Sequence, residues 1–320
     1  MIEEEMQRLE SLKGIADNIV NLSYQEAKKL VFQAIPSFPI STDTIDKIHR
    51  PDEYGWYRDP SIILRCRPDA ISRKGHHIQS PFQTLEDISI VPKKVHHQIP
   101  TGRCNQRENP IFYASNYPVT ACLEAASNGF TKDFQSTTVT MGAWKIISPL
   151  NLAIMTFSSS TLAELDGNTG FSYDRIQSHR KMMRQNIENQ ITTGIDQRHS
   201  ADFSMAILDF FSDQFGKMEI LHESDYFLSN IYCDAVFNHA FADESNSLYD
   251  GILYPSVKNA LQEFNIALHP RAMGKLHFVG AEHIWITRHP GDKYQFDSID
   301  KGYLLSNGEL HWNVFNHQEV

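Results

Sequence analysis

Hydrophobic residues recur every three or four positions in the first 35 residues of the chain, the spacing that gathers them on one face of a helix. Ser23, with Glu26 three positions later, has the form of a capping box, the residue pair that opens a helix. Pro36 then ends the pattern, because proline cannot donate the hydrogen bond that continues a helix. The pattern predicts two helices, and we expect residues 1–50 to form a helical extension that packs on the main domain.

Strand-like runs rich in β-branched and aromatic residues, each bounded by turn signals, follow in the rest of the chain. They cover residues 61–67, 110–115, 137–147, 150–157 and 249–255. After the second run, Asn116 and Pro118 supply the signals that start a helix, which we expect to extend to about residue 128. These residues therefore predict a tight unit of strand, turn and helix.

The chain changes in character at residue 158. Residues 158–222 combine a serine-rich start with polar and amphipathic helical patterns, so we predict a helical insertion there and a further helix over about 224–242. The tail predicts paired strands, one pair turned at Asn307-Gly308, which is a strong hairpin signal.

Together the patterns predict an α+β fold, with a central sheet of short, mostly antiparallel strands that forms a cleft and helices packed outside it. We expect three segments along the chain. They are the helical extension of residues 1–50, a main domain of residues 51–275 that contains the insertion, and a β-hairpin extension of residues 276–320.

Composition and charge narrow the function classes. The 320 residues are 41% hydrophobic and 21% charged, typical of an ordinary globular protein, and the net charge of −10 disfavours nucleic acid as a partner. The chain begins with three glutamates within its first five residues, whereas a signal peptide begins with basic residues, and it contains no apolar run long enough to cross a membrane. The four cysteines are too sparse for a disulfide framework. We therefore expect a cytoplasmic protein with reduced thiols and no membrane partner.

Most of the residues suited to chemistry lie in three short segments. They are Arg65-Cys66-Arg67, then Gly102-Arg103-Cys104-Asn105 with Tyr113 and Glu124 downstream, then Asp250-Gly251 with Tyr254-Pro255-Ser256. Most of these residues also have an ordinary structural interpretation. Glu124 is typical of a solvated carboxylate on a helix, Tyr113 of a core aromatic residue, and Ser256 of a turn or cap. Arg65 differs, because it lies in an apolar run where a buried guanidinium needs a partner.

In their order and spacing these segments resemble the RES domain, a family named for its Arg, Glu and Ser residues. The most specific part is Gly102-Arg103-x-Asn105 followed by residues 110–115 and 120–124, and the resemblance covers about residues 60–157 and 223–270. It implies a fold like that of ADP-ribosyltransferases and an enzyme that degrades NAD by hydrolysis or phosphorolysis. It also implies a toxin that a helix-turn-helix antitoxin, encoded beside it, holds inactive.

The resemblance also implies roles for named residues. Cleavage of the bond between nicotinamide and ribose expels a neutral pyridine, so the main requirement is to stabilise an oxocarbenium-like ribose, and a carboxylate such as Glu124 suits it. Guanidinium groups match phosphate oxygens in a bidentate way, so Arg65 and Arg103 are the candidates for the pyrophosphate of NAD. Tyr113 would stack on the nicotinamide or bind the ribose, and Ser256 would hold the carboxamide, phosphate or water. Further candidates for binding NAD are Arg67, Asn105 and Tyr254.

Two alternatives stay open. The first keeps the fold but changes the acceptor, giving a mono-ADP-ribosyltransferase that acts on a protein. The second is a catalytically silent RES-like module that binds a protein partner. It is motivated by the insertion and by Cys66 and Cys104, which stand where family members carry aromatic residues.

Histidines occur in adjacent pairs at His76-His77 and His96-His97. Adjacent side chains on a strand point to opposite faces, and the sequence offers no acidic or cysteine partner that would complete a metal site. We therefore expect no metal. We also expect Cys104 and Cys122 to be inert, because neither is paired with a histidine in the manner of a nucleophile.

Overall fold

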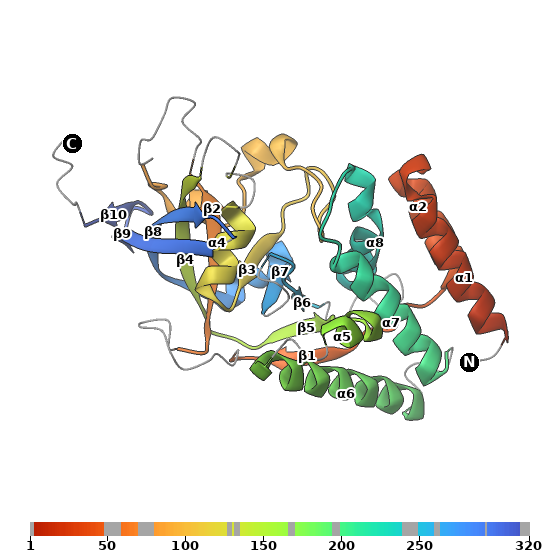
Figure 1. The fold of residues 1–320 in the computed structure, drawn as a ribbon. Coiled ribbons are helices and arrows are strands. Elements are labelled where there is room, and N and C mark those ends of the chain that lie inside the picture. Colours follow the sequence, from red (N-terminus) through yellow and green to blue (C-terminus); the bar gives the residue numbers. More distant parts are fainter. Residues whose placement is uncertain are drawn as a thin grey trace. The chain divides into compact units, whose positions relative to one another are not determined.

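A computed structural model shows a chain of helices and mostly antiparallel strands (Figure 1). It describes residues 3–47, 59–69, 80–126, 130, 135–165, 170–193, 199–238, 249–258, 263–291 and 293–313. These residues belong to two compact units. Unit 1 comprises Met1–Thr44, His97–Asn109 and Asn151–Val257, and unit 2 comprises Ile45–His96, Pro110–Leu150 and Lys258–Val320.

Unit 1 contains most of the helices. They are α1 (Glu3–Asp17), η1 (Ile19–Asn21), α2 (Tyr24–Ala34), α5 (Ser159–Leu165), α6 (Gly170–Thr192), α7 (Ala201–Phe215), η4 (Glu223–Tyr226) and α8 (Phe227–Asn238). Its strands are β1 (Thr42–Ile45), β5 (Leu150–Ile154) and β6 (Gly251–Pro255), and β5 runs parallel to β6. The helices predicted within residues 158–222 are present as α5, α6 and α7, whereas their being an insertion into the main domain stays a prediction.

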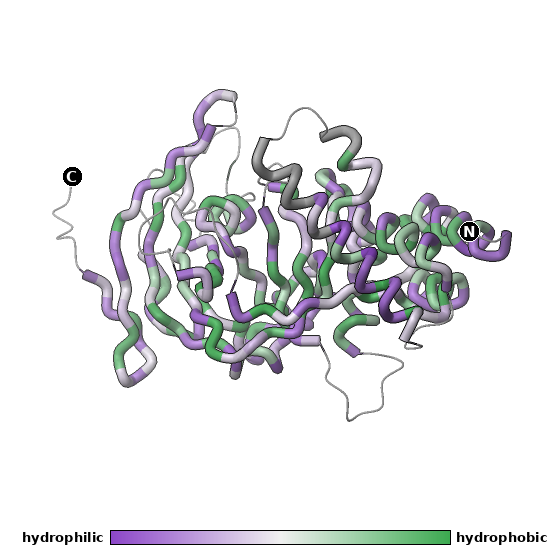
Figure 2. The backbone as a smooth tube through the Cα atoms, turned by 90° about the horizontal axis from the view of Figure 1, so that it is seen from below, coloured by the Kyte–Doolittle hydropathy of each residue, from purple (hydrophilic) through white to green (hydrophobic). Residues whose placement is uncertain are grey.

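The two predicted N-terminal helices are confirmed. The Ser23 hydroxyl accepts the backbone N–H of Glu26, whose carboxylate in turn accepts the backbone N–H of Ser23, so the predicted capping box is present. In Figure 2 the helix that starts beside the N label carries hydrophilic and hydrophobic stretches side by side. Its hydrophobic face is buried through Leu12 and Ile15.

Aromatic rings fill much of the core of unit 1. Phe211 of α7 and Tyr232 of α8 lie 5.0 Å apart between ring centroids, and Phe38 packs against both. Phe215 extends this cluster to Tyr254 of β6 at 5.3 Å. Ridges of large side chains on α7 and α8 therefore hold the two helices together and cover β6.

Unit 2 is built on seven strands in the order β7-β3-β2-β4-β8-β9-β10, and every neighbouring pair among them is antiparallel. Their bounds are β2 (Ile62–Pro68), β3 (Phe112–Ser115), β4 (Ser136–Ile146), β7 (Phe264–Leu268), β8 (Leu276–His289), β9 (Lys293–Leu304) and β10 (Leu310–Trp312). Helix α4 (Pro118–Ala126) belongs to this unit, as do the short α3 (Leu85–Ile88) and η5 (Pro270–Lys275). A further short helix, η3 (Lys93–Gln98), spans the division between the units.

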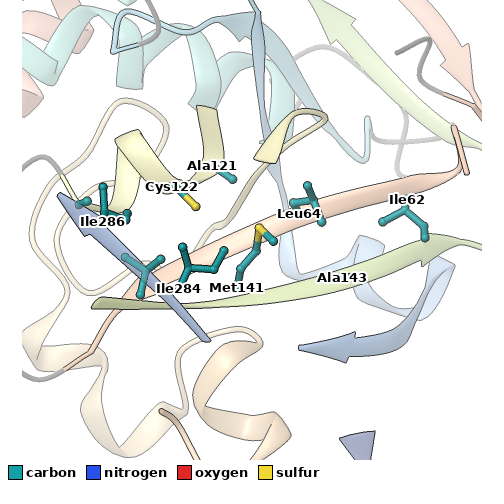
Figure 3. Close-up of a cluster of buried hydrophobic side chains, with 10 residues drawn as sticks. Ile62, Leu64, Ala121, Cys122, Met141, Ala143, Ile284 and Ile286 are labelled. Carbon is teal, nitrogen blue, oxygen red and sulfur yellow. The ribbon is translucent and has the colours of Figure 1, made fainter. Parts of the chain in front are cut away.

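Helix α4 covers one face of the unit 2 sheet. Alternate residues of β2, β4 and β8 point towards it, because successive side chains of a strand face opposite sides. Figure 3 shows this cluster, in which Ala121 and Cys122 of α4 face Leu64 of β2, Met141 of β4 and Ile284 of β8. The predicted unit of strand, turn and helix is thus confirmed, with α4 held to the sheet by apolar contacts.

The predicted C-terminal hairpin is also confirmed. Gly308 has φ of +85°, a left-handed conformation that favours glycine, and its turn brings Leu310 opposite Leu304. Through β8, which pairs with β4 along its length, the C-terminal strands continue the sheet of unit 2.

The fold is therefore of the predicted class, helices with a mostly antiparallel sheet, whereas the likeness to ADP-ribosyltransferases and the three-segment division stay predictions. No helix in the described part of the chain is long and apolar enough to cross a membrane.

Candidate functional site

The eight predicted site residues are divided between the two units. Unit 2 contains Arg65, Arg67, Tyr113 and Glu124, and unit 1 contains Arg103, Asn105, Tyr254 and Ser256. The two groups are described in turn.

Arg65 is a buried cation in the middle of β2, with 7% of its surface exposed. Leu64 and Cys66, its neighbours, point towards α4, so the Arg65 side chain leaves the strand on the other face. There its guanidinium lies 4.9 Å from the ring centroid of Phe112, and Nη1 donates a hydrogen bond to the Tyr113 carbonyl oxygen at 3.2 Å. The Nε–H group is buried and has no hydrogen-bond partner within the described ranges.

Arg65 lies at the point where β2 stops pairing with β3. The recorded pairing between β2 and β3 is Leu64 with Ser115, whereas β2 continues to pair with β4 as far as Pro68. Beyond Leu64 the guanidinium reaches from β2 to the β3 backbone. Burial, followed by the charge of Arg67, lowers the pKa of Arg65 to about 9, so the group is still a cation at neutral pH.

Arg67 lies on the same side of β2, two residues along. It donates to the Asp87 carbonyl oxygen, and its guanidinium lies 5.0 Å from the ring centroid of Phe82. Burial also lowers the pKa of Arg67, and the carboxylate of Asp87 opposes that shift. The pair thus concentrates positive charge on one face of β2 in a chain whose net charge is −10.

Glu124 is half-buried on α4, on the opposite side of the sheet from Arg65. Its carboxylate accepts a hydrogen bond from Asn265 Nδ2 at 2.7 Å. Asn265 belongs to β7 and pairs with Ser115 of β3, while Tyr113 pairs with Ala267 of the same strand. The structure therefore brings Arg65 to Tyr113, holds Glu124 over the neighbouring strand β7, and has Arg65 and Glu124 approach β3 from opposite faces.

Arg103, in unit 1, resembles Arg65 in its contacts. Nη2 donates to the Lys217 carbonyl oxygen at 2.6 Å, and the guanidinium lies 5.9 Å from the ring centroid of Tyr226. Its Nη1 is buried and, over the residues that the structure describes, has no hydrogen-bond partner. Unlike Arg65, this arginine lies in a loop and is only half-buried.

The other three predicted residues of unit 1 are integrated into its packing. Asn105 Nδ2 donates to the carbonyl oxygens of Pro100 and Gln106, at 2.8 and 2.9 Å, so this amide closes its own loop. Tyr254 packs in the aromatic core described above, and Ser256, directly after β6, is 0% exposed.

Cys66 and Cys104 lie in contact with other thiols. Cys66 Sγ is 3.7 Å from Cys122 Sγ, and Cys104 forms a side-chain hydrogen bond with Cys233. None of the four thiols, all of which lie in the described ranges, forms a disulfide. Burial raises the pKa of Cys66 and of Cys233, which disfavours the reactive thiolate.

Metal ligands do not gather in the described part of the chain, where no group of three or more His, Cys, Asp or Glu side chains could hold an ion. His76 and His77 lie outside that part, and His96 Nε2 is bonded to the Val91 carbonyl oxygen at 2.9 Å. The expectation of a metal-free protein stays a prediction.

Two residues that the sequence did not single out individually shape the unit 2 site. Phe112 stacks under Arg65, and Asn265 holds Glu124 from 141 positions away. Asn265 lies within residues 223–270, where a resemblance to the RES domain is predicted, but its partner becomes visible only once β7 is paired with β3. The chain matches no model of a known protein family, and no curated protein matches it.

Proposed function

We propose that the chain is an NAD-degrading enzyme of the RES type, which cleaves the bond between nicotinamide and ribose and acts as a toxin. The observation that carries the proposal is the state of Arg65. A guanidinium that is buried beside a second arginine, with an Nε–H that no described residue accepts, is unfavourable unless an anion binds it. The pyrophosphate of NAD is such an anion, because it offers oxygens in the geometry that a guanidinium fork matches.

The neighbouring groups support the same chemistry. Tyr113, whose backbone Arg65 contacts, would stack on or bind the nicotinamide riboside. Because Arg65 and Glu124 lie on opposite faces of the sheet, an NAD molecule that contacts both would pass between β2 and β3 beyond Leu64, where the pairing of the two strands ends. There Glu124 would place a negative charge near the ribose carbon as its bond to nicotinamide breaks, and the Asn265 amide would keep that carboxylate in one orientation. NAD and water then give nicotinamide, ADP-ribose and a proton, whereas NAD and phosphate give nicotinamide and ADP-ribose phosphate.

The test is release of nicotinamide from NAD by the purified chain, with and without inorganic phosphate. We expect release by the wild type and a decrease on the order of 10²–10³-fold in Glu124→Gln, the range for loss of one transition-state contact. Glu188→Gln is the matched control, because Glu188 is an exposed helix carboxylate paired with Arg184. Absence of release by the wild type under both conditions would overturn the proposal.

The same reactions identify the acceptor of the ADP-ribose group. Label from the adenylate part of NAD that stays in small molecules indicates hydrolysis or phosphorolysis, whereas label on protein indicates an ADP-ribosyltransferase. The toxin proposal has its own measurement. Induced expression should stop growth and lower cellular NAD, and Glu124→Gln should relieve both effects, whereas a harmless wild type with normal NAD would favour the silent binding module.

A further inference from the structure

Two thiols of unit 2 lie close enough together to be joined. Cys66 of β2 and Cys122 of α4 both face the apolar layer between the helix and the sheet, and their Sγ atoms are 3.7 Å apart. A disulfide bond is about 2.0 Å long, so the two sulfur atoms would have to approach each other by less than about 2 Å. Side-chain rotation and a small shift of α4 towards β2 can supply that approach.

A half-open pocket of about 420 Å³ leads to this pair, between the start of α4 and the strands beneath it. Cys122 lines the pocket although only 1% of the residue is exposed, and Figure 3 shows its side chain directed from α4 towards Met141 of β4. Met141 also lines the pocket and pairs with Cys66 in the β2–β4 ladder. A small molecule in the pocket therefore meets Cys122 first, with Cys66 in contact behind it. The lining residues are Tyr117, Pro118, Val119, Cys122, Met141, Glu282, Ile284, Phe296 and Ser298.

The lining favours a small, uncharged reactant. Most of the side chains are apolar, and the carboxylate of the pocket, Glu282, lies opposite Lys301 in the β8–β9 ladder, so its charge is matched by a neighbouring one. Hydrogen peroxide is neutral and close to water in size. Glutathione disulfide, by contrast, carries several charged groups and is a much larger molecule. We therefore expect the pocket to admit the peroxide and to exclude the peptide disulfide.

We propose that Cys66 and Cys122 form a reversible redox site, which hydrogen peroxide reaches through the pocket and closes to a disulfide. In the first step the Cys122 sulfur attacks one peroxide oxygen, the O–O bond breaks, and the other oxygen leaves with the thiol proton as water. The product is a sulfenic acid. The Cys66 sulfur then attacks the Cys122 sulfur, the S–O bond breaks, and the hydroxyl group leaves with the Cys66 proton as a second water. Two thiols and one peroxide thus give one disulfide and two waters.

The second step should be the slow one. Burial raises the pKa of the Cys66 thiol and so keeps the attacking thiolate scarce, while the charge of Arg65 opposes that rise. We therefore expect closure over minutes to hours, within the range of disulfide formation in proteins. This differs from the expectation of an inert Cys122, because the pocket and the second thiol are brought to Cys122 only by the fold.

The disulfide would join two segments that carry candidate site residues. Cys66 directly follows Arg65, and Cys122 lies two positions before Glu124. By fixing α4 on β2, the redox state would regulate NAD cleavage, and this consequence rests on the proposed function. Formation of the disulfide does not, because it is measured on the thiols themselves. Failure of the redox site and failure of the proposed function are therefore observed separately.

The test exposes the intact chain to hydrogen peroxide or to glutathione disulfide, alkylates the remaining thiols and maps the linked peptides by mass spectrometry. Cys66→Ser removes the second thiol, so that a cyclic dione can trap the sulfenic acid. Ser298→Trp fills the pocket from an exposed position on β9 and leaves both thiols in place. The internal control is the pair Cys104 and Cys233 of unit 1, whose thiols also contact each other but belong to neither α4 nor the pocket.

We expect hydrogen peroxide to link Cys66 to Cys122 several-fold faster than glutathione disulfide does and several-fold faster than it links the control pair. Dithiothreitol should restore both thiols. Ser298→Trp should slow closure several-fold, and Cys66→Ser should yield the trapped sulfenic acid at Cys122. The proposal is overturned if the wild type keeps all its thiols after hours in millimolar peroxide, if the control pair or Ser298→Trp reacts at the wild-type rate of Cys66 and Cys122, if glutathione disulfide acts as fast as peroxide, or if no sulfenic acid is trapped.

Discussion

Unit 2 buries two charged side chains near the end of β2, and it surrounds them differently. The Asp69 carboxylate, 3% exposed, accepts the Thr140 hydroxyl at 2.6 Å and lies 3.0 Å from His283 Nε2. The Arg65 guanidinium has one backbone carbonyl and one aromatic face, and its Nε–H is unbonded among the described residues. Asp69 has partners on both carboxylate oxygens, so we expect its charge to stabilise the fold. Arg65 keeps an N–H group that no described residue accepts, so its charge is suited to binding a ligand.

The largest expected effect comes from removing the well-partnered charge. Asp69→Ala leaves His283 and Thr140 buried without their acceptor, so we expect a loss of about 3–5 kcal/mol in the free energy of unfolding. Chemical denaturation measures it. Asp297→Ala, an exposed aspartate of the same unit, is the control and should change stability by less than about 0.5 kcal/mol. A loss below about 1 kcal/mol for Asp69→Ala would show that Asp69, like Arg65, does not stabilise the fold appreciably, and would contradict the contrast drawn between the two charges.

Removing the under-partnered charge should have opposite effects on stability and activity. Arg65→Met keeps the length of the side chain without the cation, so without NAD we expect stability to be unchanged or higher by about 1–3 kcal/mol. Nicotinamide release should fall about 10–100-fold, the value of a hydrogen bond to a charged group.

Arg184→Met, which removes an exposed ion pair with Glu188, is the matched control and should change neither quantity appreciably. Destabilisation by more than about 2 kcal/mol in Arg65→Met would show that the guanidinium is itself a structural cation.

Asn265 tests whether Glu124 needs its neighbour. Asn265→Ala removes the amide that orients the carboxylate, so we expect kcat to fall about tenfold with little change in KM, the signature of a positioning residue. Asn265→Asp replaces the amide donor with a second carboxylate that repels Glu124, so we expect kcat to fall at least as far as in Asn265→Ala. An unchanged kcat in both variants would show that Glu124 does not need the Asn265 amide.

The smallest expected effect on stability comes from Asp59, a carboxylate near the surface. Asp59 accepts hydrogen bonds from the Ser61 hydroxyl and backbone N–H and lies 3.0 Å from Lys145, and these contacts lower its pKa from 3.8 to about 2. The folded protein therefore holds this carboxylate deprotonated where the unfolded chain takes up a proton. The stabilisation is present above pH 4 and is lost as the pH falls towards 2.

Because Asp59 is partly exposed, its contribution should stay below about 1 kcal/mol. Denaturation of the wild type and Asp59→Asn at pH 5 and pH 2.5 measures it. A difference between the two proteins that grows at the lower pH would contradict the sign.

The sequence predicted the elements whose signals are local. The boundaries of β2 and α4 follow from an apolar run ended by Pro68 and from the start signals at Asn116 and Pro118, and the structure agrees within a few residues. The turn at Asn307-Gly308 needs a left-handed glycine, which the dipeptide itself indicates. The capping box of α2 is likewise a four-residue pattern.

The rest depends on pairings between distant segments. Strand β1 was not predicted, because its sequence Thr-Asp-Thr-Ile does not alternate apolar and polar residues. It lies at the edge of the sheet, where a strand is half solvated and needs no such alternation. The contact of Glu124 with Asn265, and the position of Arg65 where β2 and β3 stop pairing, follow from the order β7-β3-β2. Tyr254 and Asn105 matched a motif, yet their side chains are committed to a core and a loop, and sequence spacing gives no sign of that.

The most direct measurement is the affinity of NAD for Glu124→Gln, in which slow turnover allows binding to be titrated, compared with the double variant Glu124→Gln/Arg65→Met. If the Arg65 guanidinium holds the pyrophosphate, NAD should bind the single variant and bind the double variant at least about tenfold more weakly. Equal affinity in the two proteins, or no binding to either, would contradict the role assigned to Arg65.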